Sequence, residues 1–252
     1  MESAATYESL TSDLYALGVR GGDVLFVQAS MRSLGLVVGG AQTVVSALEW
    51  AVRSEGLVLM PSFQLIERSQ RSACWNRRTS PATTGWLTEY FRCMPGTLRS
   101  DHYSHSVAAR GCAASEWVEA AVPEGGFSSP WDREPWMKTF GNRSPLYLCY
   151  ERGAKALMLG VGYESLTFMH LVEVMDWHRR LDSDPCAEYR WLDRVAAGED
   201  WETCGAVHSG LVGRAPSRLF GVRTFVDTLL ARVESDASLF KLSPSAESHS
   251  VL

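Results

Sequence analysis

Short apolar runs alternate with helical patterns along the N-terminal part of the chain. Residues 7–17 repeat leucine at helical spacing, and residues 23–29 form a continuous apolar run of strand length. A glycine-rich stretch, Ser30–Gly40, leads into a second helical pattern, and another apolar run follows at Leu57–Pro61. The order strand, loop, helix and strand predicts a βαβ unit, and therefore some parallel sheet.

The remaining patterns are shorter and are separated by polar segments, among them residues 64–82 and the long loop predicted at 122–144. They predict helices at Thr84–Arg92, Ser115–Ala121, Leu166–His178 and Arg223–Val233, and strands at Leu146–Tyr150, Ala156–Val161 and Glu188–Leu192. No internal repeat or clear linker interrupts them. We therefore expect one domain over residues 1–234 and a loose, serine-rich tail over residues 235–252.

Composition and charge narrow the class of protein. The chain has 252 residues, 46% hydrophobic and 21% charged, which is ordinary for a globular protein with an ample core. A net charge of −5 does not favour a nucleic-acid or membrane-surface partner. No secretory signal and no apolar run long enough to cross a membrane is visible, so we expect a cytoplasmic protein. The six cysteines are widely spaced without a C-x-x-C pair, which favours reduced thiols over a zinc site.

The glycine-rich stretch Ser30–Gly40 is the first candidate for chemistry. Glycines allow a ligand to approach the backbone, and the helix start that follows offers N–H groups to phosphate or carbonyl oxygens. It is not a P-loop, because no G-K-[ST] closes it. From spacing alone, a plain turn between strand and helix remains the alternative.

A second glycine motif, G-V-G-Y-E-S from Gly160, follows a predicted strand. It resembles the dinucleotide fingerprint G-x-G-x-x-G with serine in the third glycine position. The match is imperfect and too little chain follows to complete a Rossmann domain, so a nucleotide-dependent oxidoreductase is the weaker alternative.

Histidines supply the candidate proton carriers. His170 and Glu173 share one face of the predicted helix, so a carboxylate there can orient an imidazole that accepts a proton near neutral pH. A packed histidine inside an amphipathic helix is the alternative. His102 and His105 lie in Arg99–Gly111, whose arginines and hydroxyls could hold phosphates or an amide, or form a solvated loop leading into a short strand. No H-E-x-x-H or G-x-S-x-G motif is present, so neither a metal nor a serine hydrolase is expected.

Taken in order, these segments resemble the aminoglycoside 3-N-acetyltransferase family over roughly residues 15–232. Five segments carry the resemblance, and they begin at Val27, Met60, Thr79, Leu157 and Gly210. In that order, they are similar to the family motifs V-H-S-S-L-x-x-L-G-x-V-x-G-G-A, M-P-T-[FY], T-P-S-x-T-G-x-L, L-L-G-V-G-x-x-x-x-T-x-x-H-x-x-E and G-x-V-G-x-A. Gln28 and Ala29 depart from the family's His-Ser. The stretch between Glu173 and Glu202 is also shorter than the acid-rich stretch of family enzymes that act on aminoglycosides.

The resemblance implies an α/β fold peculiar to this family, with a central mixed sheet flanked by helices and distinct from the GNAT acetyltransferases. It also implies acetyl-CoA as donor and an amine as acceptor. The implied cofactor-binding residues are Ser30, Met31, Ser33, Leu34, Gly35, Val37, Gly39, Ser106, Gly160, Val161 and Gly162. His170 matches the family's general base, with Glu202 as the first candidate for its orienting carboxylate and Glu173 close by.

The acceptor suggested by the resemblance is the 3-amino group of a 2-deoxystreptamine aminoglycoside, which would give antibiotic resistance. Asp176 and Asp182 follow the predicted base and are candidates to bind its ammonium groups, although Arg179, Arg180 and Arg190 weaken that negative field. A smaller or anionic amine from natural-product metabolism and an inactive CoA-binding protein remain alternatives. We expect direct attack without a metal or an acyl-enzyme, in a monomer or homodimer.

Overall fold

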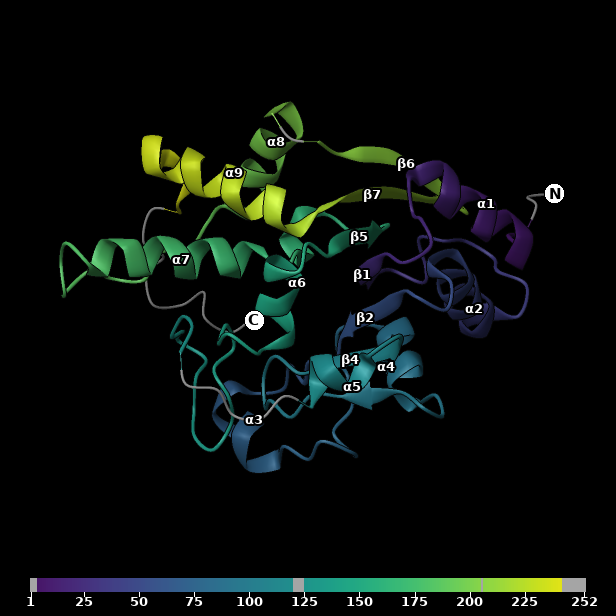
Figure 1. Cartoon of the computed structure of the whole chain (residues 1–252), viewed down its shortest axis with the longest axis horizontal. Coiled ribbons are helices and arrows are strands. Elements are labelled where there is room, and N and C mark those ends of the chain that lie inside the picture. The colour runs from purple at the N-terminus through teal and green to yellow at the C-terminus, as the bar shows by residue number, and fades with distance from the viewer. Residues whose placement is uncertain (1–3, 120–124, 205, 242–252) are drawn as a thin grey trace.

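The computed structural model describes residues 4–119, 125–204 and 206–241. Within them, one mixed sheet has the strand order β3-β4-β2-β1-β5-β7-β6 (Figure 1). The strands are β1 (Val24–Ala29), β2 (Leu57–Pro61), β3 (Leu98–Arg99), β4 (Val107–Gly111), β5 (Lys155–Leu159), β6 (His208–Val212) and β7 (Ala215–Gly221). The helices are α1 (Tyr7–Leu17), α2 (Gly40–Val52), α3 (Arg68–Cys74), α4 (Trp86–Cys93), α5 (Ala114–Val118), α6 (Pro145–Glu151), α7 (Met169–Leu181), α8 (Arg194–Cys204) and α9 (Val222–Ser235), with 3₁₀ turns η1 (Tyr163–Ser165) and η2 (Ala237–Leu239).

The predicted βαβ unit is confirmed and forms the centre of the sheet. β1 runs parallel to β2 on one side and to β5 on the other, and its last residue, Ala29, lies opposite Leu159 at the end of β5. The other pairings are antiparallel. Because parallel strands end at the same edge, the loops after β1 and β5 emerge side by side.

Both faces of the sheet are covered, as the alternation of side chains along β1 shows. Leu25 and Val27 join the core formed with α1 and α2, whereas Phe26 joins the core formed with α6, α7 and α9 on the other face. Phe26 packs against Phe168, just before α7, with ring centroids 4.9 Å apart. Figure 1 shows α7 and α9 lying side by side. This packing fixes the start of α7 beside the end of β1.

Two predicted strands are wrong. Leu146–Tyr150 lies inside helix α6, because the Ser144 hydroxyl accepts a hydrogen bond from the Tyr147 N–H and Pro145 occupies the first turn, where its missing N–H costs nothing. Glu188–Leu192 is not a strand, and its one ladder contact is an isolated bridge between Leu192 and Phe240. The residues of this segment pack around α7 instead.

The first residues of the predicted loose tail are held by backbone hydrogen bonds. The Asp193 N–H donates to the Leu239 carbonyl at 2.8 Å, and the Lys241 N–H donates to the Trp191 carbonyl at the same distance. The chain from Ser235 to Lys241 is therefore packed against the segment before α8. The rest of the predicted tail, residues 242–252, lies outside the described residues. Among the described residues, no helix is both long and apolar enough to cross a membrane.

Candidate active site

His170 and Glu173 form a buried pair in the first turns of α7. His170 Nδ1 lies 2.7 Å from Glu173 Oε2, as expected for side chains three residues apart on a helix. Glu173 is fully buried, and its carboxylate also accepts hydrogen bonds from the Tyr189 hydroxyl at 2.8 Å and the Leu192 N–H at 2.9 Å. A carboxylate surrounded by donors requires Nδ1 to carry its proton, which leaves the lone pair on Nε2.

Glu202, the first candidate to orient His170, lies elsewhere. Its carboxylate accepts hydrogen bonds from the Tyr163 hydroxyl at 3.2 Å and from Arg218 Nε. α8 turns Trp201 into the core and presents Glu202 toward β7, where Arg218 neutralises it. The carboxylate bonded to His170 is therefore Glu173.

Arg194, which the sequence analysis did not single out, contacts the free nitrogen of His170. Its Nη2 lies 2.7 Å from Nε2, and its Nη1 donates to the Glu164 carbonyl at 2.8 Å. Burial lowers the pKa of His170 and Arg194 lowers it further, while Glu173 acts in the opposite direction. The imidazole is therefore uncharged at neutral pH, which is the protonation state that a general base requires.

A cavity of about 240 Å³ opens beside His170. Its walls come from the end of β1, the loops after β2 and β5, helix α3, the loop before β4 and the start of α8. The lining residues are Gln28, Ala29, Pro61, Phe63, Leu65, Arg71, Thr84, Thr88, His105, Trp131, Val161, Glu164, Ser165, Thr167, His170 and Arg194. Segments far apart in sequence thus meet around one imidazole.

Aromatic rings hold the His170 imidazole in place. The Trp131 ring lies edge-on to it with centroids 4.4 Å apart, and the Trp191 and His105 rings lie at 5.8 and 6.0 Å. Burial lowers the pKa of His105 well below the ordinary histidine value, and the neighbouring histidines and arginines lower it further. The spacing of His105 from His102 made it a candidate in the sequence. Trp131 lies in a segment predicted as a loop, where no pattern indicated a functional residue.

The two glycine-containing turns predicted to hold the cofactor lie in contact. The Ser33 hydroxyl donates to the Gly160 carbonyl at 3.0 Å, and its oxygen lies 2.9 Å from Ser30 Oγ. Gly160 has φ of +64°, and a side chain there would overlap Ser33. A glycine is therefore required both by the backbone and by the close approach of the two loops.

The remaining predicted cofactor residues are divided between the loops and the core. Met31 and Gly35 belong to the same loop as Ser33, and Gly39 precedes α2, whereas Leu34 and Val37 are buried. Val161 lines the cavity, and the Gly162 N–H donates to Glu164 Oε1 at 3.2 Å. The loop therefore presents only part of the predicted set to a ligand.

Ser106, another predicted cofactor residue, belongs to neither of these loops. It is fully buried, its hydroxyl donates to the Ser100 carbonyl at 2.8 Å and accepts from Arg99 Nε at 3.0 Å, and it is not among the lining residues. Arg99 also donates to the Ser62 and Ser80 carbonyls. The Arg99 guanidinium and the Ser106 hydroxyl therefore form hydrogen bonds inside the protein.

The family model described as aminoglycoside 3-N-acetyltransferase matches residues 26–234. The chain belongs to this family. It is 28% identical to the aminoglycoside N(3')-acetyltransferase-like protein YokD of Bacillus subtilis (strain 168), covering 88% of this chain and 90% of that one. It is 29% identical to aminoglycoside N(3)-acetyltransferase III of Serratia marcescens, covering 88% and 94%. A crystal structure of aminoglycoside acetyltransferase AAC(3)-IVa in complex with a gentamicin shares the fold with a TM-score of 0.76 and 25% identity, covering 97% and 93%.

These findings confirm the predicted family and fold class, a mixed sheet flanked by helices that is not a GNAT fold. The protein is an acyltransferase of the aminoglycoside 3-N-acetyltransferase type, with acetyl-CoA as donor.

The departure from the family motif at Gln28 has a structural role. The Gln28 side-chain amide donates to the Ser165 carbonyl, and its Oε1 accepts from the Thr167 N–H at 3.2 Å. Gln28 therefore ties the end of β1 to the turn before α7, which positions His170.

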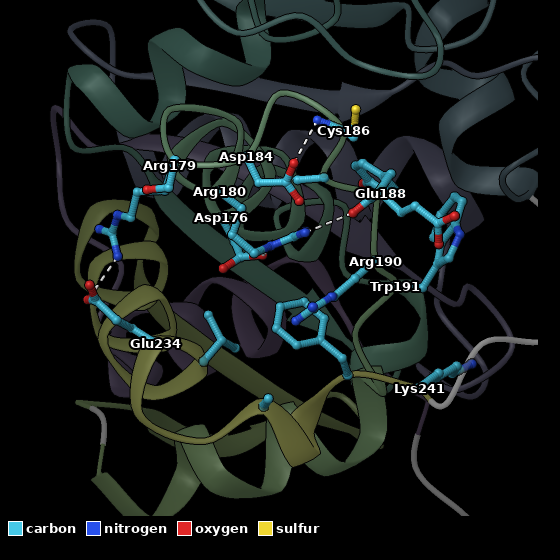
Figure 2. A pocket seen from close by; sticks show the side chains of 16 residues that line it. Asp176, Arg179, Arg180, Asp184, Cys186, Glu188, Arg190, Trp191, Glu234 and Lys241 are labelled. Atoms are coloured by element: carbon cyan, nitrogen blue, oxygen red, sulfur yellow. Dashed lines mark hydrogen bonds and ion pairs between the residues drawn. The ribbon is translucent and has the colours of Figure 1, made fainter.

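Asp176 and Asp182, the predicted acceptor carboxylates, lie away from the His170 cavity. Asp176 lines a separate groove of about 990 Å³ along the second half of α7, and its carboxylate accepts from Arg180 Nε at 2.8 Å (Figure 2). Asp182 follows the end of α7 and lines neither space. Figure 2 shows arginine and carboxylate side chains mixed around this groove, so its charges largely neutralise one another. Within residues 4–119, 125–204 and 206–241, no cluster of side chains suits a metal ion.

Proposed function

We propose that this enzyme transfers the acetyl group of acetyl-CoA directly to an amine, with His170 as general base and Glu173 as its orienting carboxylate. The observation that carries the proposal is the His170–Glu173 hydrogen bond, which leaves Nε2 as acceptor at the edge of the cavity. The amine reacts as its free base, after its ammonium proton has gone to solvent, and a neutral imidazole can accept the second proton that the nitrogen loses as it attacks.

The reaction needs no covalent enzyme intermediate. The amine nitrogen attacks the thioester carbonyl carbon, its proton passes to His170 Nε2, and the C–S bond breaks as the tetrahedral adduct collapses. The proton on Nε2 then goes to the sulfur of CoA. Glu173 stabilises the imidazolium in between, as the carboxylate of a catalytic triad does. Arg194 has to leave Nε2 before this transfer, because the lone pair cannot accept two protons.

The loops after β1 and β5 are proposed to hold the pantetheine arm. Their contact through Ser33 and Gly160 places backbone groups of both loops beside Val161, which lines the cavity. N–H groups of the Ser30–Gly35 loop are the proposed donors to the oxyanion. Ser106 is not part of this proposal, because its hydroxyl is occupied in the interior.

Two classes of acceptor follow from different observations. The name of the Serratia relative and the gentamicin complex of AAC(3)-IVa support an aminoglycoside, acetylated at its 3-amino group. The side chains around His170 support a smaller amine instead, because arginines border the cavity and neither Asp176 nor Asp182 lines it. An oxidoreductase is no longer proposed, since the Gly160 turn belongs to an acyltransferase family.

Two measurements test the reaction itself. Acetyl-CoA at a hundredfold excess over its dissociation constant should stabilise the native state by about 3 kcal/mol, whereas NAD should leave the melting temperature unchanged. Release of CoA thiol is then followed with gentamicin, kanamycin, neomycin and a set of small amines, and the product is checked for one added acetyl group. Stabilisation by NAD and not by acetyl-CoA would contradict the proposal.

A further inference from the structure

Arg71, on helix α3, is a buried cation that pairs with no carboxylate of the described residues. It is only 6% exposed, and its Nε donates to the Ile66 carbonyl at 2.7 Å. Its terminal nitrogens form no hydrogen bond or ion pair with any described residue, and Glu67 acts on it only from a distance. Arg71 nevertheless lines the His170 cavity. A buried guanidinium loses its hydration, and an anion in the cavity would restore the lost interactions.

Arg194 adds a second guanidinium to the same cavity. It lies against His170 Nε2, and both Arg71 and Arg194 act electrostatically on His105, whose ring is 6.0 Å from that of His170. Among the described lining residues, Glu164 alone is acidic, and Glu173 is sealed beneath His170. Two guanidinium groups therefore reach this cavity against one lining carboxylate, an arrangement that suits an anion better than a polycation.

The phosphates of acetyl-CoA do not account for this field. They lie at the far end of the pantetheine arm from the thioester, and the thioester carbon has to reach His170. The cavity, at about 240 Å³, is also smaller than the usual range of about 300–1,000 Å³ for sites of drug-sized ligands. A small molecule suits it.

We propose that the acceptor is a small amine that also carries an anionic group, a carboxylate or a phosphate, bound by Arg71 and Arg194. This rests on the proposed acetyl transfer and names its substrate class. Guanidinium groups bind such anions through paired, charge-assisted hydrogen bonds.

The same anion would prepare the base. In the structure, Arg194 occupies the Nε2 lone pair that has to accept the proton of the amine. An anion is a stronger acceptor for a guanidinium than a neutral imidazole is. An acceptor bearing one therefore draws Arg194 from His170, whereas a neutral amine leaves the base blocked.

The experiment compares amines that differ only in the anionic group. The full chain is assayed for CoA thiol release with glycine, β-alanine, aminobutanoate, aminohexanoate and O-phosphoethanolamine, each beside its amide or ethanolamine, and with kanamycin. At least one acid-bearing amine should have kcat/KM about tenfold or more above its neutral partner. The chain length and the choice of carboxylate or phosphate then identify the group.

Variants separate an anion site from a general role in catalysis. Arg71→Gln should lower kcat/KM about 10- to 100-fold for the acid-bearing amine and much less for the neutral amine, and Arg71→Lys should recover part of the loss. Arg68→Gln, an exposed arginine on the same helix, is the matched control and should change neither. Equal losses for both amines, or better use of kanamycin or the neutral partners, would overturn the proposal.

Anion binding itself gives a second readout. At constant ionic strength, inorganic phosphate should raise the melting temperature of the native protein, and Arg71→Gln should abolish the shift. An unchanged shift in the variant, or none in the native protein, counts against the anion site. No thiol release with any amine, together with no stabilisation by acetyl-CoA, counts instead against the proposed acetyl transfer.

Discussion

Glu173 and Glu202 show how little a carboxylate's place in the sequence says about its partner. Both are compatible with orienting His170 when only the sequence is considered. Glu173 is three residues away on the same helix and bonds Nδ1 directly, whereas Glu202 is held by Arg218 and Tyr163. The local helical geometry determined the first contact, and the packing of α8 on β7 determined the second.

Substitution of these residues tests the assignment. His170→Gln should lower kcat about 10²- to 10⁴-fold, because the base is lost. Glu173→Gln should be similarly damaging, since an amide no longer fixes the Nδ1–H tautomer or stabilises the imidazolium. Glu202→Gln is the control and should retain nearly normal kcat. A larger loss in Glu202→Gln than in Glu173→Gln, measured by thiol release, would contradict the assignment.

The charge of Arg194 should be visible in the pH dependence of the reaction. Arg194 lowers the pKa of His170, so its removal in Arg194→Gln should raise that pKa. Because the base works only when deprotonated, activity is lost as the pH falls through this pKa. The acidic limb of the kcat/KM profile should therefore move to higher pH in the variant.

Arg179→Gln is the matched control for the pH profile. Arg179 lies on the exposed side of α7 and pairs with Glu234, so its loss should leave the limb in place. An acidic limb that stays fixed or moves to lower pH in Arg194→Gln would show that Arg194 does not act on the base.

At the scale of elements, the site depends on two parallel strands ending together. β1 delivers Gln28 and the Ser30–Gly40 loop, and β5 delivers the Gly160 turn. Gln28 then ties β1 to the turn before α7, so three elements are held in one arrangement. The glycines in these loops permit contacts that larger residues would prevent.

Gly160→Ala tests the contact between the loops. The substitution strains a backbone with φ of +64° and forces a methyl group onto Ser33, so it should lower the free energy of unfolding by about 1–3 kcal/mol and weaken acetyl-CoA binding. Gly153→Ala is the control, because φ is +68° but no atom lies within 4 Å of the added Cβ. It should show only the backbone cost of about 1–2 kcal/mol and normal acetyl-CoA affinity. Urea unfolding and binding titrations compare the two, and equal effects would argue against close packing of the loops.

At the scale of the whole molecule, several polar side chains in and near the site are buried, and their burial affects the stability of the fold. Arg99, His102, His105, His170 and Glu173 are all buried, and each is held by neighbours from other segments. His102 Nδ1 accepts from the N–H groups of Ser104 and His105 at 3.2 and 2.9 Å. Protonation of that nitrogen would break both bonds.

The stability of the protein should consequently fall in mild acid. Burial lowers the pKa of His102 to about 4 from 6.5, so the unfolded chain binds a proton before the native state does. The contribution of this group to the free energy of unfolding is present above pH 6.5 and is lost as the pH falls from there toward 4. This group alone accounts for about 3 kcal/mol of the decrease. Urea unfolding across this range measures it.

His102→Asn provides the comparison, because an amide oxygen can accept the same backbone hydrogen bonds and does not titrate. The variant should have a smaller pH dependence, whatever its stability at neutral pH. An unchanged slope would mean that His102 does not carry the effect.

Local signals in the sequence were enough to predict the elements that frame the site. Apolar periodicity and glycine positions predicted the βαβ unit, the helix bearing His170 and the loops after β1 and β5, because helix and strand patterns repeat over a few residues. The ordered motifs also indicated the family and its donor. A short apolar run such as Leu146–Tyr150 is compatible with either a strand or a helix, and it was predicted as a strand. The N-cap at Ser144 favours the helix that the structure shows.

Which charged groups meet at the site depends instead on how the elements pack together. Arg71, Trp131 and Arg194 come from segments whose residues have no periodic pattern, and the fold brings them to His170 across the end of the sheet. Asp176, close in sequence to the base, faces a different groove because a helix turns successive side chains in different directions. The charge beside the base follows from long-range packing, which local sequence patterns do not encode.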